Sequence, residues 1–189
     1  MDELKVAIQA ALQSDDRIQR AQVRAWIHGA QDIETFALLY RLTDEGWNRI
    51  EPRLDQDETR YLICRYLLMC VRDNPQGLAA LPRYEAAGEL EAWFDHLSDM
   101  EDAQKTLQEV AVAVTNLFLT SDDDVRAAIE TGFLEHVLEQ VRLRPLFAHW
   151  AENEQLQDAW QHALAWGEAH PNQMKAVRER LRELQSHER

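Results

Sequence analysis

Three consecutive aspartates, Asp122, Asp123 and Asp124, are the side chains whose type and spacing could most directly do chemistry. Clustered carboxylates can hold a metal ion or act as acid and base. The run lacks the D-x-D-x-D-G spacing of a calcium loop, so further ligands would have to converge from elsewhere. Ser121-x-x-Asp124 has the pattern of a capping box, in which a short polar side chain accepts from the first amides of a helix. We therefore predict a helix start, with Ser121 as its N-cap.

Three histidines lie one helical turn or less from a carboxylate, which could support a metal or a general base. The pairs are His136 with Glu139, His149 with Glu152, and Asp158 with His162. We interpret them as surface pairs that stabilise a helix slightly. The sequence contains no P-loop, dinucleotide-binding, nucleophile-elbow or H-E-x-x-H motif. None of the seven histidines has a carboxylate three residues before it, which excludes the di-iron pattern. We predict no catalytic residue, no cofactor and no metal.

Charge is distributed unevenly along the 189 residues, whose net charge is −14. The acidic segment, residues 85–139, holds 14 Asp/Glu and only two basic residues, a local net charge of −12. The C-terminal segment, residues 174–189, carries five Lys/Arg against three Glu. An acidic surface repels nucleic acid and anionic lipid, so we expect neither as a partner. It suits a basic protein or a Lys/Arg-rich segment, or serves only solubility. Whether the basic segment packs onto the acidic one stays open.

Helical periodicity runs along the whole chain and predicts an all-α fold of stacked antiparallel helices. Asp55-x-x-Glu58 and Ser98-x-x-Glu101 have the pattern of further capping boxes. We expect one domain over 1–189, with N-terminal helices in 1–54, a repeat-like acidic core in 55–141, Trp-rich helices in 142–170 and a basic helix in 171–189. The tryptophans at helical spacing indicate core packing first and a ligand cleft second. We expect a cytoplasmic protein, since the N-terminus lacks a signal peptide and Cys64 and Cys70 are spaced like core residues.

An internal repeat is the most specific pattern in the chain. "GELEAWFDHL" (88–97) and "GFLEHVLEQV" (132–141) align at a period of 44 residues, each after an apolar helix and a polar turn. Residues 110–141 resemble an armadillo repeat of the armadillo/HEAT class, with a weaker copy in 61–97. The resemblance implies a superhelix, although the residues alone equally permit a compact helical bundle. It also implies a non-catalytic scaffold that binds extended protein segments. Asn116 matches the family's peptide-contacting asparagine, or serves as a helix hydrogen-bonding residue.

Together these features predict a protein-protein interaction module that binds a basic partner through an acidic helical face. A narrower form is an immunity or antitoxin protein that masks a basic toxin. The alternatives are an enzyme or small-ligand binder that uses the Trp-rich region with His149 and His162, and a structural subunit without a dedicated site. No oligomeric state is predicted. The predicted partner-binding residues are Glu89, Glu91, Trp93, Asp95, Asp99, Glu101, Asp102, Asn116, Asp122, Asp123 and Asp124.

Overall fold

The protein has an all-α fold, which confirms the predicted fold class. The computed structural model describes residues 3–76 and 80–187. The chain divides into two compact units, Met1–Ala86 (the first unit) and Ala87–Arg189 (the second unit). Each unit has its own buried apolar core. The expected single domain and the armadillo-like repeat stay predictions.

The first unit packs its helices around a core that includes Ile8, Phe36, Leu39 and Leu62. Two short extended segments pair in parallel within it, with Ile18 opposite Ile50. Its elements in chain order are α1 (Glu3–Gln13), β1 (Ile18–Gln19), α2 (Arg20–Gly29), α3 (Ile33–Glu45), the 3-10 helix η1 (Trp47–Arg49), β2 (Ile50–Glu51) and α4 (Gln56–Asp73).

Helix α4 begins as the sequence predicts. The Asp55 side chain accepts a hydrogen bond from the backbone amide of Glu58, and the Glu58 side chain accepts one from the amide of Asp55. This reciprocal capping box satisfies two amides that the first turn of the helix leaves without partners. At the other end Asn74 adopts the left-handed conformation, with φ of 45°, that commonly ends helices.

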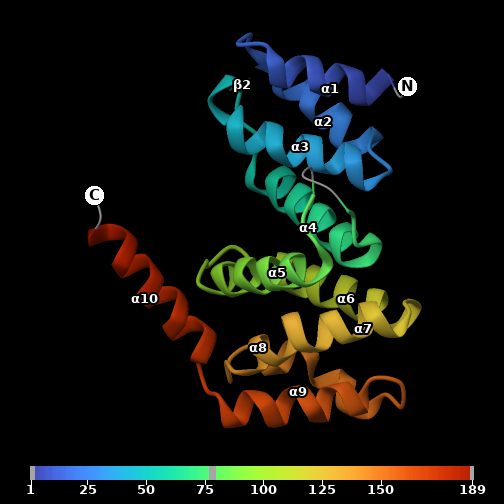
Figure 1. The fold of residues 1–189 in the computed structure, drawn as a ribbon, viewed down its shortest axis with the longest axis vertical. Coiled ribbons are helices and arrows are strands. Elements are labelled where there is room, and N and C mark those ends of the chain that lie inside the picture. The colour runs from blue at the N-terminus through green and yellow to red at the C-terminus, as the bar shows by residue number, and fades with distance from the viewer. Residues whose placement is uncertain (1–2, 77–79, 188–189) are drawn as a thin grey trace. The chain divides into compact units, whose positions relative to one another are not determined.

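The second unit begins within α5 and ends with α10 (Figure 1). Its core centres on three phenylalanines: Phe94 lies 5.5 Å from Phe133 and 6.0 Å from Phe147, measured between ring centroids. Its elements in chain order are α5 (Arg83–Ser98), α6 (Gln104–Thr120), α7 (Asp123–Ile129), the π-helix η2 (Glu130–Leu134), α8 (Glu135–Leu138), the 3-10 helix η3 (Arg144–Glu152), α9 (Gln157–Ala169) and α10 (Gln173–His187).

The tryptophan-rich region packs as core, as we predicted. Trp150 and Trp160 are buried, and the indole nitrogen of Trp150 donates a 2.8 Å hydrogen bond to the Thr115 hydroxyl. Trp166 is the exception, because it is exposed and stacks on His170 just before α10.

Two predicted capping boxes are wrong. Ser98 is the last residue of α5, where its hydroxyl donates to the carbonyl of Asp95, and α6 begins only at Gln104. The N-cap of α7 is Asp122, not Ser121, because the Asp122 side chain accepts from the Val125 amide at 3.0 Å. The aspartate run does start a helix, but one residue later than expected.

Gly167 sets how closely α9 approaches the end of α8. A Cβ atom at this position would lie 2.5 Å from the backbone carbon and oxygen of Leu138. This separation is too short for any residue with a side chain. No helix in residues 3–76 and 80–187 combines the length and the apolar character needed to cross a lipid bilayer.

Candidate protein-binding surface on the second unit

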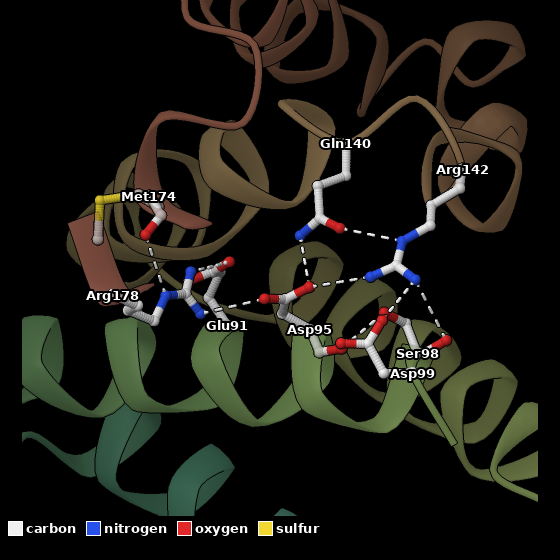
Figure 2. Close-up of polar contacts among 8 residues, drawn as sticks. All are labelled: Glu91, Asp95, Ser98, Asp99, Gln140, Arg142, Met174 and Arg178. Carbon is white, nitrogen blue, oxygen red and sulfur yellow. Dashed lines mark hydrogen bonds and ion pairs between the residues drawn. The ribbon is translucent and has the colours of Figure 1, made fainter. Parts of the chain in front are cut away.

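Glu91 and Asp95 lie on one face of helix α5, because residues four apart in a helix lie above one another, and Asp99 continues this spacing in the turn after the helix. Glu91 is 1% exposed and Asp95 9%, whereas Asp99 is exposed. Burial of a carboxylate costs free energy unless a cation and hydrogen bonds compensate it. The compensation comes from two arginines outside the acidic segment (Figure 2).

Arg178 of α10 is the first of these cations. Its Nη2 lies 2.7 Å and 2.6 Å from the two carboxylate oxygens of Glu91, and its Nη1 lies 3.6 Å from Asp95. Burial raises the pKa of the Glu91 carboxyl above its ordinary value, and Arg178 offsets that rise only in part. Glu91 is therefore a desolvated acid whose charged form depends on the guanidinium beside it.

Arg142 is the second cation, and Gln140 links it to α5. Asp95 Oδ1 accepts from Gln140 Nε2 at 2.7 Å and from Arg142 Nη2 at 3.2 Å. Gln140 Oε1 in turn accepts from Arg142 Nε at 3.1 Å. Arg142 Nη1 donates to Asp99 at 2.7 Å, and this bond holds the pKa of Asp99 below its ordinary value. The result is a continuous network in which Asp95 accepts hydrogen bonds from Gln140 and Arg142 and forms an ion pair with Arg178.

Glu139 binds the first turn of α10. Its Oε2 accepts from the backbone amide of Met174 at 2.8 Å, and its Oε1 lies 2.8 Å from His136 Nδ1. A carboxylate suits this position because the N-terminal amides of a helix carry partial positive charge. The interpretation of His136 and Glu139 as a surface pair is wrong, because Glu139 is not on the surface. It is 1% exposed, since it lies beneath α10. Its contacts make it a helix cap.

We refer to Glu91, Asp95 and Glu139 as the carboxylate cradle. All three are buried, all three belong to α5 or the end of α8, and all three contact α10. A polar cavity of about 160 Å³ lies beside the cradle, between α5 and α10; it is lined by Ala92, Asp95, His96, Asp99, Lys175, Arg178 and Glu179. Chemically, the cradle binds a guanidinium and a helix N-terminus together.

The other two histidine–carboxylate pairs take different partners. His162 Nδ1 lies 3.3 Å from the Glu130 carboxylate. His149 is exposed and its Nε2 lies 3.4 Å from the Thr115 hydroxyl. In the ranges that the structure describes, no three His, Cys, Asp or Glu residues come together as a possible metal site.

The predicted partner-binding residues divide into buried and exposed groups. Glu91 and Asp95 are occupied inside the protein, and Trp93 is half-buried. Seven others are exposed in addition to Asp99: Glu89, Glu101, Asp102, Asn116, Asp122, Asp123 and Asp124. The acids before α6 and those after it lie at opposite ends of this 17-residue helix, roughly 25 Å apart at 1.5 Å per residue. The structure thus does not gather the exposed acids into one patch.

Sequence reasoning missed the residues that complete the cradle: Gln140, Arg142, Met174 and Arg178. Their partners on α5 or α8 lie between 35 and 87 positions earlier in the chain. The available signal was the contrast between the acidic segment and the basic segment after it. No family model, curated protein or solved structure matches the chain.

Proposed function

We propose that the protein is a non-catalytic protein-protein interaction module, and that the second unit binds a basic segment of a partner protein. One observation supports this most directly: the unit already holds a basic helix, through the ion pair of the half-buried Arg178 with the buried Glu91. Carboxylates that are paired and oriented in advance lose little freedom when a guanidinium binds them.

The exposed acids have a different role in this proposal. Glu89 lies on α5 and Glu101 and Asp102 lie in the turn after it, whereas Asp122 to Asp124 begin α7. Exposed charges contribute roughly 0–1 kcal/mol per pair but accelerate the encounter of oppositely charged surfaces. We therefore expect them to attract a basic partner and to make binding sensitive to salt.

The same chemistry suits an immunity or antitoxin protein, whose partner would be a basic toxin. A small-ligand site in the Trp-rich region has less support, because Trp150 and Trp160 fill the core of the second unit. We propose a cytoplasmic location, where basic intracellular proteins are available.

The test is a pull-down from native lysate with the tagged full-length protein, at low and at moderate salt. We expect a stoichiometric basic protein that is lost at moderate salt. Charge reversal at Glu101 and Asp102, or at Asp122 to Asp124, then identifies the surface that attracts it. Glu152→Lys is the matched control, since Glu152 is exposed on the same unit but lies outside the acidic segment. Binding that ignores every acidic variant, or that persists at high salt, contradicts the proposal.

A further inference from the structure

We propose that α10 is a built-in, displaceable occupant of the carboxylate cradle, and that the partner's binding element is a helix carrying arginine one turn after its N-terminus. This inference rests on the proposed function and specifies the chemistry of the partner. The spacing is that of α10 itself. The Met174 amide meets Glu139, and Arg178, four residues later, meets Glu91 and Asp95.

α10 is held by its charged edge rather than by apolar burial. Val177, Leu181 and Leu184 fall on one helix face but are 45%, 52% and 56% exposed. The residues of α10 that line the cavity beside α5 are instead Lys175, Arg178 and Glu179. Helices in proteins gain most of their stability from a buried apolar face, and an isolated helix of this length is marginal in water. α10 therefore belongs to the least stable part of the second unit.

The cradle requires a cation whenever it is covered. If α10 left and an uncharged segment replaced it, Glu91 and Asp95 would be buried without Arg178, at a cost in free energy. Arg142 and Gln140 would still orient Asp95, since neither belongs to α10. The remaining vacancy matches a helix N-terminus at Glu139 followed, one turn later, by a single guanidinium at Glu91. An arginine-bearing helix satisfies both requirements.

A second copy of the chain is a weaker candidate for the occupant. Exchange of α10 between two copies makes the same contacts as the single chain but gives up the high effective concentration of a tethered segment. A foreign helix can add charged contacts of its own, for example with the exposed carboxylates Glu89 and Glu101. Those additional contacts are what would allow it to displace α10.

The experiment uses the full-length protein and a synthetic peptide of the α10 sequence, residues 172–187, with a fluorophore at its C-terminal end. Binding is measured by fluorescence anisotropy. Arg178→Ala weakens the chain's own α10 and so vacates the cradle. We expect the peptide to bind this variant at least about tenfold more tightly than wild type, because a site that is rarely open binds with reduced apparent affinity. Adding Glu91→Gln should abolish the gain.

Arg180→Ala is the matched control, because it removes the same charge from an exposed position of the same helix. It should leave peptide binding at the wild-type level. Circular dichroism melts verify that each variant is folded, and Arg178→Lys, which keeps the charge, should give intermediate binding. Equal peptide affinity for wild type and Arg178→Ala, or no binding to either, overturns the proposal.

Light scattering over a range of protein concentrations tests the second copy. A wild-type dimer that Arg178→Ala abolishes would overturn the foreign-partner proposal in favour of exchange between copies. The inference and the proposed function can fail separately. A basic partner that depends on the exposed acids but is indifferent to Arg178→Ala keeps the proposed function and removes the inference. Peptide exchange without any basic partner keeps α10 as a displaceable occupant of the cradle, but it removes the proposed function and the partner helix with it.

Discussion

Arg178 and Glu91 lie 87 positions apart in the chain, yet a single guanidinium nitrogen contacts both carboxylate oxygens at 2.7 Å and 2.6 Å. This pair fastens the last helix to α5 and neutralises an acid that is almost completely buried. The charge contrast between the acidic and basic segments is therefore partly resolved inside the protein.

Arg178→Ala should release α10 while the core of the second unit stays folded. The variant loses the charged hydrogen bonds to Glu91, which contribute roughly 1.5–3 kcal/mol. Each loss of about 1.4 kcal/mol in the free energy of opening lowers the protection of the α10 amides about tenfold. Amide hydrogen exchange resolved along the chain measures the effect. Faster exchange should be confined to α10, and Arg180→Ala should change little. Unchanged exchange in α10 would show that the pair does not hold this helix.

Glu91→Gln should change how stability depends on pH. Burial raises the folded-state pKa of Glu91 above the ordinary value of 4.5, so the native state binds the proton more tightly than the unfolded state. The stability linked to this group is fully present below pH 4.5 and is lost as the pH rises through the folded-state pKa. Urea unfolding at a series of pH values measures it. With rising pH, the free energy of unfolding of the wild type should fall relative to that of Glu91→Gln. If it rises relative to the variant instead, the pKa of Glu91 is not raised in the folded state.

Arg142→Gln should raise the pKa of Asp99 toward its ordinary value, because the Arg142 hydrogen bond is the main cause of the lowering. In wild type the resulting stabilisation is present above the unfolded-state pKa and is lost as the pH falls through the lowered one. Carbon-13 titration of the side-chain carboxyl reports the value directly. Arg144→Gln is the control, since Arg144 contacts Glu168 and the Leu138 carbonyl instead. Asp99 should titrate in this control as in wild type.

Gly167→Ala should destabilise the second unit, whereas Gly88→Ala should not. A Cβ at Gly167 would meet the Leu138 backbone at 2.5 Å, and forcing α9 away costs about 1–3 kcal/mol. A Cβ at Gly88 meets nothing within 4 Å, and alanine in a helix is favoured over glycine by roughly 0.5–1 kcal/mol. Thermal and urea unfolding should therefore move in opposite directions for the two variants. A shift of the same sign in both would contradict the close α8–α9 contact.

Local patterns predicted local structure well where nothing distant competed. The capping box at Asp55 needs only its own first turn, and it forms as expected. Ser98 carries the same pattern but continues α5, since Leu97 beside it is buried in the core. Tertiary burial thus decides between two positions with equivalent local chemistry.

The sequence could predict the acidic side of the site but not its basic side. Glu91 and Asp95 share one helix face by spacing alone and Asp99 continues that spacing, so a cation that contacts this row of acids was foreseeable. That the cation would be Arg178 was not, because a helix pattern says nothing about which distant segment covers it. Burial of Glu91 follows from the docking of α10 and could not be read before that docking was known.

The buried pair also constrains how this sequence can diverge. Loss of Arg178 alone removes the cation that holds α10 over Glu91, and loss of Glu91 alone leaves Arg178 without its closest carboxylate, so either single change is penalised. A joint change to two apolar residues of similar volume avoids both penalties. Descendants of this chain should therefore show positions 91 and 178 varying together, and a lineage that breaks the correlation should have acquired a different ending to its last helix.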